Sequence, residues 1–158
     1  MERKLEPYKG GVSIVKKQIF RWALVILWLI LTVYLSQQSG SESSATSSWL
    51  AHKLFRIFEM LGINISYSAF HAVLRKIAHF GIHFVLAWLE YRALLISCDR
   101  RRNAIIVTLV LFGAIALFDE AIQSIAPGRA MMLFDATINL SGVILGTIIG
   151  ILTTKQIK

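Results

Sequence analysis

The chain has 158 residues, of which 56% are hydrophobic and only 16% are charged, whereas a soluble domain carries about 25% charged residues. This composition excludes a disordered chain, a coiled coil and a nucleic-acid-binding domain, and the lone Cys98 excludes a disulfide framework and a Cys-based metal site. A small integral membrane protein remains, and its net charge of +8 is assigned to Lys and Arg in cytoplasmic loops.

The first apolar stretch, residues 19–35, follows a basic tail over residues 1–18. It is short against the ~20 residues that a membrane-spanning helix needs, so a cleavable signal peptide is the alternative. The polar run at residues 36–40 contains no A-x-A cleavage site. We therefore predict an uncleaved first membrane helix, with Arg21 reaching back to the interface.

Three further apolar stretches are predicted to cross the membrane, at residues 67–97, 104–126 and 133–152. None alternates like a β-strand, and a helix satisfies its own backbone hydrogen bonds in lipid. The third stretch stops at Pro127-Gly128, which does not easily continue a helix. The predicted fold is therefore an all-α integral membrane bundle of four helices over residues 19–152, followed by a short tail over residues 153–158.

Loop charges orient this bundle. The N-terminal tail, the turn at residues 100–102 and the C-terminal tail are rich in Lys and Arg, and four spans place all three on one side. The loops on the opposite side hold fewer basic residues. Because cytoplasmic loops carry the excess of Lys and Arg, both termini are predicted to lie in the cytoplasm.

Residues 48–62, between the first two spans, form an amphipathic helical pattern. Apolar residues recur at helical spacing on one face, and polar residues fill the other. Ser48 is the predicted N-cap and Gly62 the predicted C-terminal stop. An interfacial helix lying flat on the outer leaflet fits this pattern, as does a linker helix packed over the bundle.

Charged and polar side chains lie inside the predicted spans, toward the outer end of the bundle. Because such groups are costly in lipid, they usually face the bundle interior or an aqueous cavity. The predicted ligand-binding set is Lys76, His79, Asp119, Glu120, Gln123, Arg129, Asp135 and Asn139. The alternative is a closed ion-pair network that only fixes helix packing. In that network Lys76 and Arg129 face the carboxylates of Asp119, Glu120 and Asp135, and Asp119 pairs with one of the two cations.

The second span contains two histidines that could bind a metal. His79 and His83 lie one helical turn apart, a spacing that metal ligands use. However, the H-E-x-x-H order is absent, and Lys76 and Arg129 would repel a cation. We therefore predict neither a metal nor a cofactor.

Glycines form a regular pattern in the last span. Gly142, Gly146 and Gly150 recur every four residues, which keeps them on one face of a helix. Such a ridge of small residues lets two backbones approach closely in a membrane. The ridge is therefore predicted to face a neighbouring helix.

Three motifs follow one another along the chain: Arg75-Lys76-x-x-His79-Phe80, then Asp119-Glu120-x-x-Gln123 with Pro127-Gly128-Arg129, then Asp135-x-x-x-Asn139-x-x-Gly142-x-x-x-Gly146. In this order and spacing they resemble the VanZ-like family over residues 20–152. The resemblance implies a small polytopic protein of the bacterial cell membrane, in a family whose name-giving member is associated with resistance to the glycopeptide antibiotic teicoplanin. Many members carry Glu-Tyr where this sequence has Ile82-His83, so His83 would supply the polar tip there.

The leading hypothesis for function is an outer polar pocket that binds or modifies the headgroup of a lipid, glycolipid or cell-wall precursor, with Lys76 and Arg129 facing its phosphate or carboxylate. The second is a membrane enzyme in which His79, Glu120 or Asp119 does acid/base chemistry on a lipid-linked phosphate or ester. The third is a non-catalytic structural or partner subunit. Membrane lipids are the expected partners, nucleic acid is not, and no oligomeric state is predicted.

Overall fold

The structure is a computed structural model that describes residues 9–38, 40–98, 100–125 and 132–154. Its elements in chain order are α1 (Lys9–Ser36), α2 (Gly40–Met60), α3 (Tyr67–Ser97), α4 (Arg101–Val107), the π-helix η1 (Thr108–Phe112), α5 (Gly113–Gln123) and α6 (Leu133–Thr153). The described residues contain no strand. Four stretches are long and apolar enough to cross a membrane: Ile14–Ser36, Tyr67–Ser97, Arg101–Gln123 and Leu133–Thr153. The predicted all-α membrane fold with four spans is therefore confirmed.

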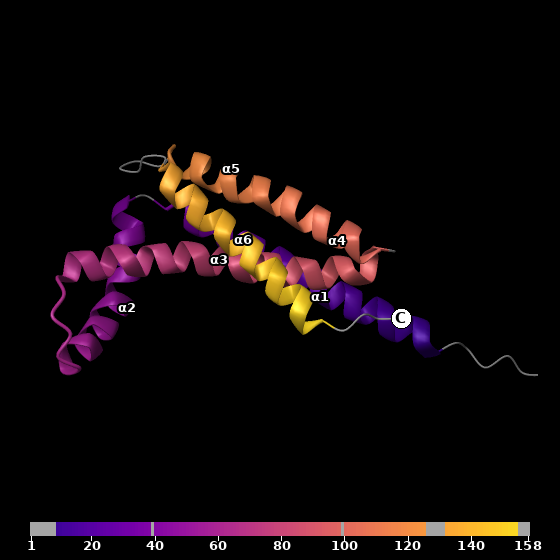
Figure 1. The fold of residues 1–158 in the computed structure, drawn as a ribbon, viewed down its shortest axis with the longest axis horizontal. Helices are drawn as coiled ribbons and strands as arrows, with labels where there is room; N and C mark the ends of the chain where they lie inside the picture. The colour runs from indigo at the N-terminus through magenta and orange to yellow at the C-terminus, as the bar shows by residue number, and fades with distance from the viewer. Residues whose placement is uncertain (1–8, 39, 99, 126–131, 155–158) are drawn as a thin grey trace, which may run out of the picture.

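The long helix α3 is central to the bundle (Figure 1). Helix α6 packs along it and α1 lies against it. In the continuous stretch α4–η1–α5, η1 and α5 pack on α6, and α4 contacts α3. The first described turns of α1 and the end of α6 lie at the same end of the molecule (Figure 1). This is the arrangement that an even number of crossings produces. We call the opposite end, where α1 ends and α3 and α6 begin, the cluster end.

The third span is interrupted by a π-helical turn. It begins at Arg101, earlier than the predicted start, and changes to π geometry over Thr108–Phe112 before α5 continues to Gln123. The hydroxyl of Thr108 donates to the carbonyl of Ala104, 2.9 Å away. Such π turns are rare and occur often at functional sites. The predicted stop at Pro127-Gly128 lies outside the described residues.

Helix α2 differs from the prediction at its start. It begins at Gly40, so Ser48 is an interior residue and not the N-cap. The Ser48 hydroxyl donates to the carbonyl of Ala45 at 2.9 Å, a local bond that lets a serine sit inside a helix. Gly62, in contrast, is confirmed as the stop, because its φ of 73° is the left-handed conformation that glycine favours.

The interior of the bundle is built from small and medium side chains. Ala87, Ala93 and Ala116 are fully buried in one core with Leu86 and Phe112. Many large apolar side chains instead point outward, among them Leu27, Phe118 and Leu152. Because lipid is as apolar as these side chains, exposing them costs nothing in a membrane, and close packing of small residues holds the helices together.

The glycine ridge of α6 faces α3, as predicted. A Cβ atom on Gly142 would lie 2.5 Å from the carbonyl oxygen of Phe80, and one on Gly146 would collide with the carbonyl of Phe84. A Cβ on Gly150 would lie 2.6 Å from the ring of Tyr91. The two backbones can approach this closely only because no side chain intervenes. The contact fixes the register in which the polar start of α6 meets the polar face of α3.

Candidate functional site: a buried polar cluster between the spans

Asp119, on α5, is the centre of the polar cluster. Its Oδ2 atom lies 3.3 Å from Nε2 of His83 on α3 and accepts a hydrogen bond of 2.8 Å from Nε2 of Gln123. Its Oδ1 atom accepts a hydrogen bond from the hydroxyl of Ser36, the last residue of α1. The carboxylate thus joins three spans, and the four side chains are all buried.

Of the two cations predicted to pair with Asp119, Lys76 does not do so, and Arg129 lies outside the described residues. The Nζ atom of Lys76 lies 2.6 Å from Oδ1 of Asp135 in the first turn of α6 and 4.7 Å from the ring centroid of Phe134. The reason is the level along α3: Lys76 precedes His83 by two turns, or about 10 Å, and so meets the start of α6. With 31% of its side chain exposed, Lys76 lies at the partly exposed edge of the cluster.

Glu120 and Asn139 make contacts that tie the helices together. Oε1 of Glu120 accepts a hydrogen bond of 2.9 Å from the backbone N–H of Met132, just before α6 begins. Such an N–H has no partner within its own helix, so the carboxylate acts as a cap. The amide of Asn139 donates to the carbonyl of Ala116 at 3.4 Å, which links α6 to α5.

His79 and His83 have different surroundings. His79 is half-buried and lies close enough to Asp119 to interact with it electrostatically. His83 is 1% exposed and makes the direct contact. The sequence prediction placed His79 in the binding set and left His83 and Ser36 out. The seven-residue spacing of Lys76 and His83 on one helical face was the available signal for His83, whereas Ser36 looked like the start of a loop.

Several buried polar atoms in the cluster have no hydrogen-bond partner among the described residues. They are Nδ1 of His83, Oε2 of Glu120 and Oδ1 of Asn139. Leaving a buried donor or acceptor unpaired costs about 1–3 kcal/mol. The cluster therefore holds more hydrogen-bonding capacity than the contacts between its helices use.

Glu90 is a further buried carboxyl group, two turns beyond His83 on α3. Its side chain has no exposed surface, and neither oxygen has a hydrogen-bond partner among the described residues. Thr108, which opens the π turn, lies beside it, but its hydroxyl donates to a backbone carbonyl. A polar group buried without a hydrogen-bond partner is destabilising, and in a membrane helix such a group is a candidate for a functional role.

The cluster does not form a recognisable metal centre. Within the part of the chain that the structure describes, no three His, Cys, Asp or Glu side chains come together as ligands. Asp119 and His83 bind each other, and Asp135 is engaged by the ammonium of Lys76. Arg129, the remaining member of the predicted set, lies outside the described residues.

Comparison with known proteins identifies the family. A model of the VanZ/LLP1 family matches residues 20–154, which is nearly the whole chain. No curated protein and no solved structure matches the chain. The matched region contains most of the first span, the other three spans in full and every residue of the polar cluster, so this chain belongs to the VanZ/LLP1 family.

Proposed function

We propose that the polar cluster binds the polar headgroup of a lipid, glycolipid or lipid-linked cell-wall precursor. The observation that carries the proposal is a set of buried atoms on His83, Glu120 and Asn139 that have no hydrogen-bond partner among the described residues. They lie next to the partly exposed Lys76–Asp135 pair. A ligand that enters past Lys76 would satisfy those atoms by hydrogen bonding. The phosphate or carboxylate of the ligand would pair with the ammonium of Lys76 at the partly exposed edge of the cluster.

Arg129 is the second cation of the proposed site. It lies in the segment between Ile125 and Met132, and Glu120 holds the N–H of Met132 by a hydrogen bond. Met132, which contacts the cluster through Glu120, is therefore only three residues after Arg129 in the sequence. A guanidinium there would bind a phosphate with two parallel hydrogen bonds, which an ammonium does not do.

We propose that the cluster end faces the outside of a bacterial cell and that both termini are cytoplasmic. The excess of Lys and Arg in the tails and at residues 100–102 supports this orientation. Lys155→Cys in a Cys98→Ser background tests it with a membrane-impermeant thiol reagent. We expect labelling only after the cells are permeabilised, and labelling of intact cells contradicts the orientation.

The binding proposal is tested with the full chain, purified in detergent, and a polyprenyl-linked cell-wall precursor as the probe. Native mass spectrometry compares the parent with Lys76→Gln and with the control Thr137→Ala, a change on an exposed position of α6. Loss of a charge-assisted hydrogen bond lowers affinity by about tenfold or more. We expect that loss in Lys76→Gln alone, with helicity unchanged by circular dichroism.

Two results contradict the binding proposal. One is equal binding of the probe by the parent and by Lys76→Gln. The other is binding of the precursor no tighter than that of a phosphatidylcholine with matched acyl chains. Either result favours the third hypothesis, in which the cluster only holds the bundle or a partner subunit together.

The contact of His83 with Asp119 favours catalysis as a second candidate function. A carboxylate that engages one imidazole nitrogen orients the ring and leaves the other nitrogen for proton transfer. Nδ1 of His83 is such an atom, and it would take a proton from water that attacks a lipid-linked phosphate or ester. We expect product formation by the parent, and at saturating precursor we expect His83→Gln to form far less product for each molecule of precursor bound. Absence of turnover in the parent contradicts catalysis on that probe without affecting the binding proposal.

A further inference from the structure

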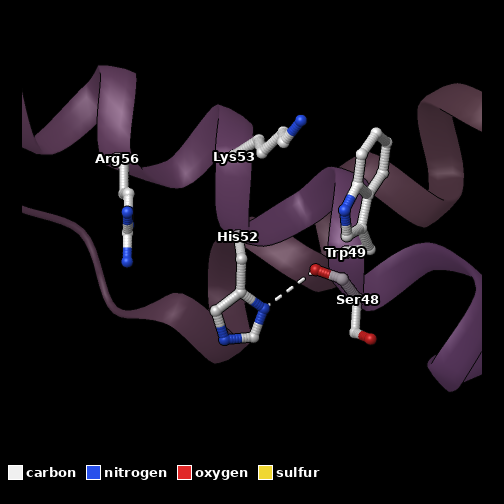
Figure 2. A pocket seen from close by; sticks show the side chains of 5 residues that line it. All are labelled: Ser48, Trp49, His52, Lys53 and Arg56. Atoms are coloured by element: carbon white, nitrogen blue, oxygen red, sulfur yellow. Dashed lines mark hydrogen bonds between the residues drawn. The ribbon is translucent and has the colours of Figure 1, made fainter.

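Helix α2 carries a second polar feature, on a different helix from the cluster that Asp119 organises. An open hollow of about 300 Å³ is lined by Ser48, Trp49, His52, Lys53 and Arg56 (Figure 2). The lining includes a lysine, an arginine and a histidine but no acidic residue. The side chains of His52, Lys53 and Arg56 are all exposed. This composition favours an anionic ligand.

Neighbouring contacts hold the lining side chains in place. Nζ of Lys53 lies 4.0 Å from the ring centroid of Trp49, a cation–π contact. Nδ1 of His52 lies 2.8 Å from the carbonyl oxygen of Ser48 and 2.8 Å from the hydroxyl of Tyr67, where α3 begins. The other ring nitrogen of His52 lies on the far side of the ring from Ser48, and Arg56 extends in the same direction as His52 (Figure 2).

No carboxylate among the described residues neutralises the positive charge of the hollow. Neither Lys53 nor Arg56 forms an ion pair with a carboxylate in the described part of the chain. Glu59 lies on the same helix but does not line the hollow. An external phosphate would therefore meet cations that no carboxylate of the described residues already engages.

The surroundings of the hollow indicate a lipid as the source of that phosphate. Trp49 and Met60 are 65% and 78% exposed on the same side of α2 as the two cations. The other side packs on α3, where Phe58 lies 5.1 Å from Phe70 between ring centroids. Exposed apolar side chains interleaved with basic ones are typical of helices at the boundary between headgroups and acyl chains. A soluble anion would not contact these exposed apolar side chains.

We propose that the hollow on α2 binds the phosphate of an anionic phospholipid. Lys53 and Arg56 pair with the phosphate, and Trp49 and Met60 border the acyl chains below it. The helix then lies along the membrane surface, across the direction of α3 (Figure 1). The site is separate from the headgroup cluster and stands whether or not that cluster binds a ligand.

The experiment uses the full chain in phosphatidylcholine vesicles that contain acyl-brominated phosphatidylglycerol or, at equal mole fraction, acyl-brominated phosphatidylcholine. Bromine quenches nearby tryptophan, and the difference between the parent and Trp49→Phe isolates the signal of Trp49. We expect stronger quenching by the anionic lipid. Lys53→Gln with Arg56→Gln should remove the preference, because each cation near an anionic surface contributes about fivefold in association.

Arg100→Gln with Arg102→Gln is the matched control, since both arginines are exposed in the loop and first turn after α3. This variant should keep the preference of the parent for the anionic lipid. Equal quenching of the parent by the two lipids overturns the proposal, as does a preference that survives in the Lys53/Arg56 variant with helicity intact. Loss of the preference on adding inorganic phosphate at constant ionic strength overturns it too, because the ligand is then a free anion.

Discussion

Nε2 of His83 lies 3.3 Å from Oδ2 of Asp119, in the buried interior of the bundle. The contact joins α3 to α5, and the hydroxyl of Ser36 on α1 bonds the same carboxylate. Because lipid offers no water to replace these bonds, each one removed leaves a buried polar group unpaired. The pair is therefore a structural link between spans as well as a component of the proposed binding site.

Removal of the His83–Asp119 contact is predicted to destabilise the bundle. His83→Leu should lower the free energy of unfolding by about 1.5–3 kcal/mol, the contribution of a hydrogen bond to a charged group. Thermal melting in detergent measures the change, with Thr137→Val at an exposed position of α6 as the control. Equal melting temperatures for His83→Leu and the parent would show that the contact contributes nothing to stability.

We predict that Lys76 and Asp135 contribute to stability as a coupled pair, and that Lys76 and Asp119 contribute independently. The ammonium lies 2.6 Å from the Asp135 carboxylate but is partly exposed, so the coupling free energy should be about 1 kcal/mol, well below that of a fully buried pair. A double-mutant cycle of Lys76→Met and Asp135→Asn measures it by thermal or denaturant unfolding. The companion cycle of Lys76→Met and Asp119→Asn should be additive, and the opposite pattern contradicts the observed pairing.

The glycine ridge gives a prediction about packing. A methyl group on Gly146 collides with the backbone of Phe84, whereas one on Gly81 meets nothing within 4 Å. Gly146→Ala should therefore cost about 1–3 kcal/mol through overpacking, and Gly81→Ala should cost nothing. Melting temperatures of the two alanine variants provide the comparison. If Gly146→Ala and Gly81→Ala have the same melting temperature, α6 does not pack closely on α3 at Gly146.

The spans and the approximate level of the polar residues could be predicted from the sequence. Apolar stretches of sufficient length fix the crossings, and the distance of Asp119 or Asp135 from a span end fixes its depth at 1.5 Å per residue. Which side chains touch depends on how each helix is rotated and how closely it packs. For that reason the sequence alone leaves open which of the carboxylates of Asp119, Glu120 and Asp135 pairs with Lys76.

Two other features have no local sequence signal. The π turn over Thr108–Phe112 has no Pro or Gly to mark it and reads as an ordinary apolar stretch. Ser36 is followed by a polar run and therefore resembles the start of a loop, yet its hydroxyl bonds Asp119 inside the bundle. The Ser36 bond joins residues far apart in the sequence, and η1 packs on α3 and α6.

The last prediction separates ligand binding from packing through Arg129, which follows Pro127-Gly128 in the sequence. If the position requires only a polar side chain, Arg129→Gln should bind the precursor as the parent does. If it binds a phosphate through a planar fork, Arg129→Lys fails as well, because a lysine supplies a point charge without the two parallel hydrogen bonds. We predict that both variants insert and melt like the parent but bind the polyprenyl-linked precursor about tenfold more weakly.

Native mass spectrometry measures that loss, and complementation of a deletion strain, including its susceptibility to teicoplanin, measures the consequence in cells. Met131→Gln is the control, because it introduces the same side chain two residues away without removing a charge. It should bind and complement like the parent. Full binding by Arg129→Gln at normal expression would mean that the headgroup is held without this cation. Lys76 would then be the remaining cation of the proposed site, and a single ammonium does not form the two parallel hydrogen bonds that a guanidinium makes to a phosphate.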